Sequence, residues 1–127
     1  MYSLGKSERL CSKTLIEELL TSEISFVKYP YRIIVKKSSL PGEYPARIAI
    51  SVSKKRFKRA VQRNRIKRLT REAYRLNKKD LYQSMAGGQT LDILFIFLDN
   101  RLPDFLKTDK ALKAALQKIQ HKFALTS

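Results

Sequence analysis

The stretch from Lys54 to Lys79 places the strongest constraint on the fold, because it is both highly basic and periodic. It carries 13 of the chain's 27 lysine and arginine residues and a single acid, Glu72. Its spacing predicts a helix over about residues 59–78. The helix has an almost uniformly cationic side toward solvent. Its other side should pack on a sheet through an apolar stripe that consists of Ile66, Leu69, Ala73 and Leu76.

The charge of this stretch indicates a nucleic-acid partner. Solvated helix faces usually mix charge signs at i,i+4 spacing, because like charges there repel each other. Here one acid relieves the repulsion, and a phosphate backbone would compensate it. A formal net charge of +16 and a pI near 10.2 favour nucleic acid, with an anionic membrane surface as the competing partner.

The 127 residues are expected to form one domain, residues 1–127, in which residues 1–8 are mobile. No stretch approaches the roughly 20 consecutive apolar residues of a membrane span, and the first ten residues lack an apolar signal region. We therefore expect a cytoplasmic protein without a membrane partner. The single cysteine, Cys11, excludes an internal disulfide, and the single histidine, His121, excludes paired-imidazole sites. No catalytic residues and no metal site are predicted.

The rest of the chain predicts strands and helices. Residues 25–37 are rich in aromatic and β-branched side chains, and Pro30 either divides this strand region or lies at an edge. Leu91–Leu98 is the most apolar run and predicts a strand covered on both faces. The other expected elements are a helix over 12–21, a loop over 37–45, a strand over 46–53, a loop over 79–90, and a helix from about 102 whose apolar side is formed by Leu106, Leu112, Ala115, Leu116, Ile119 and Phe123.

The residues after Pro30 alternate between two faces of the expected strand. One face carries Tyr31, Ile33 and Val35. The other carries Arg32, Ile34 and Lys36. This second face mixes cations with an apolar residue, so it is either a solvated exterior or an exposed binding surface.

The physical pattern leaves open whether the nucleic acid is RNA or DNA. The basic helix could lie in the major groove of DNA. No helix-turn-helix spacing precedes it, however, because a strand comes before it in the chain. Sheets with exposed basic and aromatic positions more often bind single-stranded RNA.

Two segments carry a resemblance to a known family. The residues SVSKK at 51–55, followed by AVQRNRIKRLTREAYR at 60–75, resemble the signature of the bacterial ribonuclease P protein component. The resemblance implies an α/β (α+β) two-layer sandwich that is similar to ribosomal-protein folds. Its four-stranded sheet and about three helices follow the order αβββαβα, with a left-handed βαβ crossover.

The resemblance also implies a function. Proteins of this family join a catalytic RNA that removes the 5′ leader from precursor tRNA, with magnesium held mainly by the RNA. The protein would contribute no active site of its own and would require no protein partner. Alternatives that remain are a ribosomal or chaperone-like RNA-binding protein without a nuclease role, and a DNA-binding regulator.

Carried over to this chain, the resemblance implies two sets of RNA-contacting residues. Those for the catalytic RNA are Lys54, Lys55, Arg56, Arg63, Asn64, Arg65, Lys67, Arg68, Arg71 and Arg75. Those for a leader-binding cleft between the first helix and the sheet are Ile16, Leu20, Phe26, Tyr31, Arg32, Ile34 and Lys36.

The chain departs from the family pattern in two places. The family often has Gly-Asn before the basic helix, where this chain has the longer segment Arg56–Arg59. The family also often has a phenylalanine in the first helix, on which a base could stack. This chain has Ile16 and Leu20 there, so stacking would come from Phe26 or Tyr31.

Overall fold

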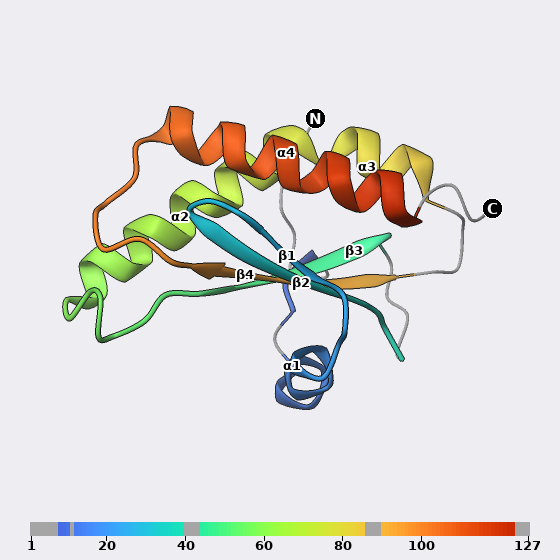
Figure 1. Ribbon diagram of the computed structural model, residues 1–127, viewed down its shortest axis with the longest axis horizontal. Coiled ribbons are helices and arrows are strands. Elements are labelled where there is room, and N and C mark those ends of the chain that lie inside the picture. The colour runs from blue at the N-terminus through green and yellow to red at the C-terminus, as the bar shows by residue number, and fades with distance from the viewer. Residues whose placement is uncertain (1–7, 11, 40–43, 86–89, 124–127) are drawn as a thin grey trace.

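The computed structural model of the protein describes residues 8–10, 12–39, 44–85 and 90–123. Within these ranges, four helices and four strands follow one another (Figure 1). They are α1 (Lys13–Leu20), β1 (Ser25–Lys28), β2 (Tyr31–Lys37), β3 (Ala46–Ser51), α2 (Ala60–Asn77), α3 (Lys79–Ser84), β4 (Leu91–Phe97) and α4 (Phe105–Phe123). The predicted order αβββαβα is confirmed, with the short helix α3 added where a loop was expected.

The four strands form one mixed sheet in the order β1-β2-β4-β3. β1 and β2 form an antiparallel hairpin whose turn contains a cis bond between Tyr29 and Pro30. β4 pairs antiparallel with β2 and parallel with β3. The parallel pair is joined through α2 and α3, which is the connection for which the resemblance implies a left-handed crossover.

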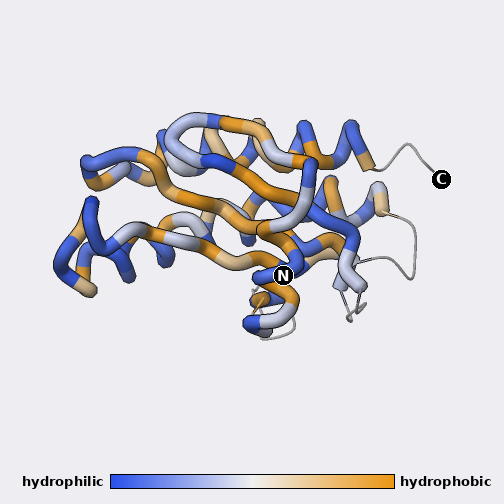
Figure 2. Tube along the Cα trace, turned by 60° about the horizontal axis from the view of Figure 1, so that its bottom comes forward, coloured by the Kyte–Doolittle hydropathy of each residue, from blue (hydrophilic) through white to orange (hydrophobic). Residues whose placement is uncertain are grey.

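The helices divide unequally between the two faces of the sheet. α2, α3 and α4 cover one face, while α1 alone lies against the other (Figure 1). Apolar residues follow the central strands, and hydrophilic residues alternate with them along the helices (Figure 2). The sheet and its helix layer therefore make the expected sandwich, and α1 gives the second face partial cover.

The main core lies between the sheet and the α2–α4 layer. β4 contributes Ile93, Phe95 and Phe97, all of them almost completely buried. The buried residues of α2 are Ile66, Thr70, Ala73 and Tyr74. The predicted stripe is thus wrong at Leu76, which is 46% exposed.

Hydrogen bonding explains how the hydroxyl of Thr70 can lie on the buried side of α2. The Thr70 hydroxyl donates to the Ile66 carbonyl at 2.8 Å and lies 2.6 Å from the Tyr31 hydroxyl. A buried polar group that is satisfied in this way carries little penalty. α4 shows the same exchange, because Thr108 is buried while Leu106, predicted to be apolar core, is 80% exposed.

A smaller core lies under α1. It joins the helix to the sheet and contains Leu10, Leu15, Leu19, Ile34 and Leu94. Ser12 caps α1 by accepting a hydrogen bond from the Leu15 amide at 3.3 Å, which satisfies one of the free donors of the first turn.

The segment before α1 is held by a buried polar cluster. The carboxylate of Glu8 lies 2.6 Å from the Lys78 ammonium and accepts a hydrogen bond from Tyr82 at 2.6 Å. The Leu10 amide donates to the Ile48 carbonyl at 2.7 Å. Glu8 is only 1% exposed, so the prediction of mobility up to this residue is wrong there. Residues 1–7 lie outside the described part of the chain.

Candidate nucleic-acid interface

The outer side of α2 carries seven of the predicted RNA-binding residues. They are Arg63, Asn64, Arg65, Lys67, Arg68, Arg71 and Arg75, which we call the α2 face. Asn64, Arg65 and Arg68 are exposed, and the other four are half-buried. The expected amphipathic helix, with one packed side and one cationic side, is confirmed.

The residues of the α2 face differ in what they contact. Arg75 forms a two-pronged ion pair with Glu72, the one acid on α2, with Nε 3.2 Å from Oε2. The hydrogen bond from Arg75 lowers the pKa of the Glu72 carboxyl. By contrast, within the described ranges Arg65 and Arg68 form no ion pair. The N-terminal half of α2 is therefore the more strongly electropositive half.

Arg63 binds the protein itself. Its Nη1 donates to the carbonyl oxygens of Phe57 at 2.8 Å and Lys58 at 2.9 Å. These carbonyls belong to the segment that connects β3 to α2. The first arginine of the RNR sequence thus fixes the connector in addition to adding charge beside it.

The connector presents the predicted residues Lys54, Lys55 and Arg56, all exposed. It turns tightly without glycine because the Phe57 amide donates to the Ser53 carbonyl at 3.1 Å and the Lys55 amide donates to Ser53 Oγ at 3.1 Å. The Phe57 ring is buried against Phe97, with the ring centroids 6.0 Å apart. Sequence reasoning missed this anchor, although a lone aromatic residue within a basic segment was a signal for it.

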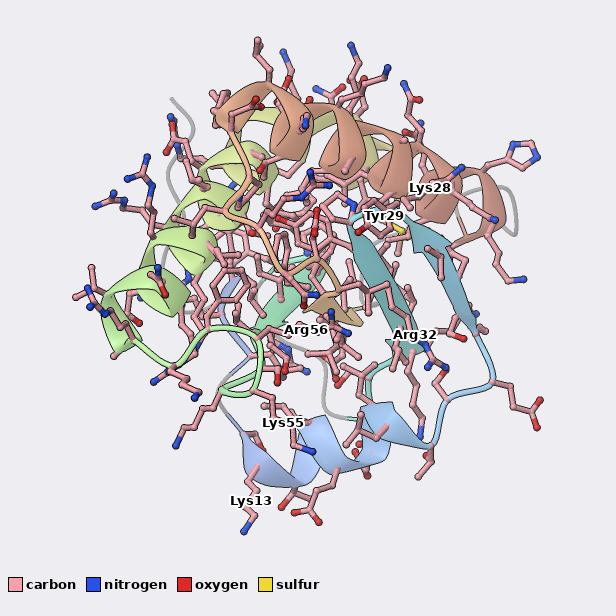
Figure 3. All side chains as sticks on the ribbon, turned by 60° about the vertical axis from the view of Figure 1, so that its left-hand side comes forward. Lys13, Lys28, Tyr29, Arg32, Lys55 and Arg56 are labelled. Atoms are coloured by element: carbon pink, nitrogen blue, oxygen red, sulfur yellow. The ribbon has the colours of Figure 1, made fainter. Side chains whose placement is uncertain are left out.

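The sheet face on the α1 side carries the second set of predicted residues. The strand register places Arg32, Ile34 and Lys36 on this face, as alternation predicted. Ile34 is buried under α1, whereas Arg32 is exposed and projects from β2 on the side of α1 (Figure 3). Lys36 ties the helix to the sheet by donating to the Glu18 carbonyl at 3.4 Å.

The register also adds two residues that sequence reasoning missed. Arg32 lies opposite Ile96 of β4, and Ile96 lies opposite Ser51 of β3. Ile96 is half-buried and Ser51 is exposed. α1 does not fully cover this end of the sheet face. The prediction that β4 is covered on both faces therefore did not identify Ile96 as a surface residue. From α1, Ile16 packs partly against the smaller core and Leu20 is 57% exposed.

Two residues predicted for the cleft lie on the opposite, helix-covered face, so their assignment to the cleft is wrong. Tyr31 is 1% exposed in the main core, and burial raises the pKa of its hydroxyl. Phe26 pairs with Ile33, and its ring lies 4.7 Å from the Lys118 ammonium of α4. The two-residue period of a strand puts both side chains away from Arg32 and Ile34. Neither ring can stack on a base in the predicted cleft.

The cationic surface does not fit a divalent cation. Hard cations such as magnesium take oxygen ligands, mostly carboxylates and carbonyls. The one carboxylate on α2 is that of Glu72, and it is already paired with Arg75. Among the described residues, no three His, Cys, Asp or Glu side chains gather into a possible metal site. No helix in those ranges is long and apolar enough to cross a membrane.

Comparison with known proteins decides the family. The family model described as Ribonuclease P matches residues 4–120. The chain belongs to the ribonuclease P protein family. A relative from Porphyromonas gingivalis named "Ribonuclease P protein component" is 40% identical over 119 residues, which cover 93% of this chain and 87% of the relative. One of the same name from Chlorobaculum tepidum is 31% identical, covering 91% and 79%.

Solved structures of the family share the fold. The RNase P protein of Staphylococcus aureus gives a TM-score of 0.69 at 24% identity, covering 90% of this chain and 96% of that one. The protein from Thermotoga maritima gives 0.68 at 23% identity, covering 87% and 96%. The sequence comparisons thereby confirm the expected family, and the solved structures confirm the expected fold.

Proposed function

We propose that this protein is the protein component of ribonuclease P and acts in the cytoplasm. It binds the catalytic RNA subunit through the α2 face and the connector. It binds the 5′ leader of precursor tRNA on the sheet face beside α1. The protein contributes no active site, and magnesium is held mainly by the RNA. No further protein partner is required.

The observation that carries this proposal is the cationic, acid-poor N-terminal half of α2. Arg65 and Arg68 project from one helix with no carboxylate of the described chain in ion-pair contact. Such mutual repulsion is relieved when phosphates replace counterions around the basic side chains. The exposed lysines of the connector extend this surface beyond the start of α2.

The face beside α1 suits a single-stranded segment. It combines the exposed guanidinium of Arg32 with apolar side chains of Ile96, Ile16 and Leu20. Single-stranded RNA is bound by basic groups along its backbone and by side chains that contact its bases. This arrangement offers both without an aromatic platform, which supports weak, sequence-tolerant contact with a leader.

The contribution to catalysis follows from electrostatics. A catalytic RNA and its precursor substrate are both polyanions, so they repel each other and compete for magnesium. Cationic side chains bound to both RNAs reduce that repulsion, and the chemistry remains with RNA and its metal ions. The effect should be largest where magnesium is scarce.

The test is cleavage of precursor tRNA by the catalytic RNA at low magnesium, with and without the protein. We expect strong stimulation that disappears as monovalent salt rises, because the contacts are electrostatic. A generic RNA-binding module would bind the RNAs without stimulating cleavage. Equal competition by duplex DNA would favour a DNA-binding protein. Either result would contradict the proposal.

A further inference from the structure

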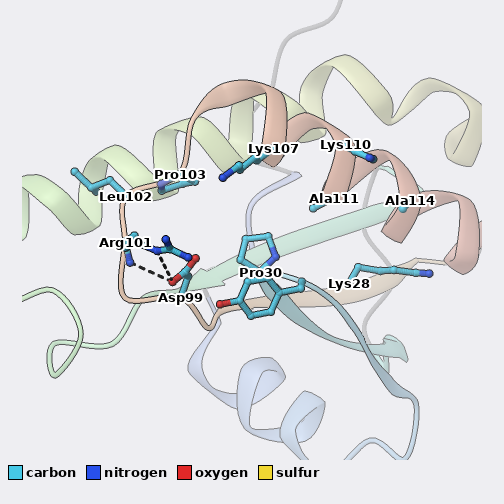
Figure 4. Close-up of a pocket in the computed structure, with 11 residues that line it drawn as sticks. Lys28, Pro30, Asp99, Arg101, Leu102, Pro103, Lys107, Lys110, Ala111 and Ala114 are labelled. Carbon is cyan, nitrogen blue, oxygen red and sulfur yellow. Dashed lines mark hydrogen bonds and ion pairs between the residues drawn. The ribbon is translucent and has the colours of Figure 1, made fainter.

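A pocket lies on the helix-covered side of the molecule, and none of its lining residues belongs to the α2 face or to the sheet face beside α1. It is formed where the β1–β2 turn, the loop after β4 and the first turns of α4 meet (Figure 4). Its volume is about 510 Å³, within the range of sites that hold small ligands. The lining includes Lys28, Tyr29, Pro30, Arg101, Lys107 and Lys110.

The pocket carries four cations and one carboxylate, that of Asp99. This carboxylate holds the loop after β4, because it accepts hydrogen bonds from the backbone amides of Asn100 at 2.7 Å and Arg101 at 3.3 Å. Burial acts to raise the pKa of Asp99, but these hydrogen bonds outweigh it and leave the pKa below its ordinary value. The Arg101 side chain lies 3.7 Å away and remains 85% exposed.

The three lysines of the pocket lack a carboxylate partner. Over the described ranges, no ion pair forms at Lys28, Lys107 or Lys110. Lys107 and Lys110 lie in the first two turns of α4, where the helix dipole disfavours cations. Asp104, just before the helix, accepts a hydrogen bond from the Lys107 amide at 2.8 Å, but within the described ranges it forms no ion pair with either lysine. An anionic ligand would compensate all three charges.

Tyr29 adds a planar group to this charge. Tyr29 is 64% exposed, more than any other tyrosine among the described residues. Its ring lines the same pocket as the three lysines. An exposed aromatic ring beside lysines without ion pairs is the combination that stacks a base and binds its phosphate. An acidic peptide would use the lysines but not the ring.

We propose that this pocket binds one unpaired nucleotide of RNA, with its base stacked on Tyr29 and its phosphate among Lys28, Lys107 and Lys110. The proposal rests on the RNA-binding function proposed above. One contact links the pocket to the connector: Arg56 Nη1 donates to the Asn100 side-chain oxygen at 2.9 Å. An RNA strand lying along the connector can therefore continue into the pocket.

The first experiment titrates the ¹⁵N-labelled full-length protein with adenosine monophosphate and follows the backbone amides. We expect the largest shifts at Tyr29, Asn100 and Arg101. Tyr29→Ala should weaken binding about tenfold, as expected for loss of one stacked base. Tyr29→Phe should keep most of the affinity, and Tyr44→Ala, which alters a tyrosine elsewhere on the surface, should change nothing. Circular dichroism confirms that each variant is folded.

Three results of this titration would overturn the proposal. The first is shifts spread over all lysines and insensitive to Tyr29→Ala. The second is equal loss in Tyr29→Phe and Tyr29→Ala. The third is a tetraglutamate peptide that shifts the same amides more strongly than the nucleotide does. Because this titration needs no large RNA, its outcome is independent of the cleavage test of the proposed function.

The second experiment identifies the RNA that supplies the nucleotide. Complexes are assembled with 4-thiouridine in either the catalytic RNA or the precursor tRNA, irradiated, and digested for mass spectrometry. A crosslink mapped to Tyr29 itself, and not to Arg32 three residues away, from one RNA assigns the source. Crosslinks from neither RNA, in complexes that cleave normally, would overturn the assignment of this pocket to RNA.

Discussion

Basic residues occur along the whole of α2, four in its first half and two in its second, and they differ in what they contact. In the N-terminal half, Arg65 and Arg68 point to solvent and lack ion pairs among the described residues. Toward the C-terminal end, Arg75 pairs with Glu72, and Lys78 just beyond α2 is buried against Glu8. A count of basic residues therefore overstates how many are available for phosphate. The exposed cations that the described chain leaves without ion pairs, Arg65 and Arg68, lie in the first half, whereas Arg75 and Lys78 toward the end of α2 are paired within the protein.

The largest effect should come from breaking the buried pair. Lys78→Ala leaves the Glu8 carboxylate buried without its cation, which typically costs about 3–5 kcal/mol. Urea unfolding followed by circular dichroism measures this cost. Lys113→Ala, which removes an exposed lysine from α4, serves as the control and should change stability by less than about 0.5 kcal/mol. A small effect of Lys78→Ala would remove the distinction between the two halves.

The second effect concerns the N-terminal half of α2. The double variant Arg65→Ala and Arg68→Ala should weaken binding to the catalytic RNA by roughly tenfold or more at physiological salt, and reduce the salt slope by about 2. It should also raise the magnesium requirement for cleavage. Stability should not change. Filter binding across a salt series measures both quantities, and an unchanged slope would show that these arginines do not contact phosphate.

The Arg63→Ala variant tests a mixed role. The change removes a cation and also the two hydrogen bonds to the connector carbonyls. We expect a loss of RNA affinity larger than that of Arg68→Ala alone, together with a modest loss of stability. Arg63→Gln, which removes the charge but keeps an amide nitrogen that can donate to these carbonyls, separates the two contributions. Stability in Arg63→Ala equal to that of the unchanged protein would argue against a role in holding the connector.

Alkaline pH should lower the stability of the fold through two tyrosines, Tyr74 in α2 and Tyr82 in α3. Burial raises the pKa of Tyr74 and Tyr82 above the ordinary value of 10.0. The unfolded chain ionises these hydroxyls near pH 10 while the folded chain keeps them protonated, so stability is complete below pH 10 and falls as pH rises above it. Tyr74→Phe should reduce this fall by up to about 1.4 kcal/mol per pH unit. Urea midpoints between pH 9 and 11 measure it, with Tyr44→Phe as control.

The smallest effect should come from the exposed pair. Arg75→Gln removes the partner of Glu72, but such surface ion pairs contribute only about 0–1 kcal/mol. Its effect on RNA affinity should also be small, because Glu72 already neutralises the charge. A loss of affinity as large as that of Arg68→Ala would show that RNA displaces Glu72 from Arg75.

Sequence reasoning succeeded where one local pattern decides the outcome. The period of α2, the alternation in β2 and the apolar run of β4 each fixed an element and its orientation to within a few residues. It failed where a side chain chooses between partners that are distant in sequence. Thr70 replaced Leu76 in the core because Tyr31 offers its hydroxyl a partner 39 residues away.

The error at the cleft had a different origin. Alternation alone placed Tyr31 with Ile33 and Val35, on the face that proved to be covered by helices. The prediction that Tyr31 and Phe26 lie in the cleft rests on the need for a stacking ring there, and it conflicts with this alternation. The exposed ring of the region, Tyr29, lies in the turn, where strand alternation makes no prediction.

The contact between Glu8 and Lys78 has a consequence for the order of folding. The two residues are 70 positions apart, and Tyr82 is 74 positions from Glu8. During synthesis the chain emerges in order, so Glu8 leaves the ribosome long before either partner exists. Helix α1 can form early, but its attachment must await the end of α2. The sheet face beside α1 is thus among the last parts of the molecule to be completed.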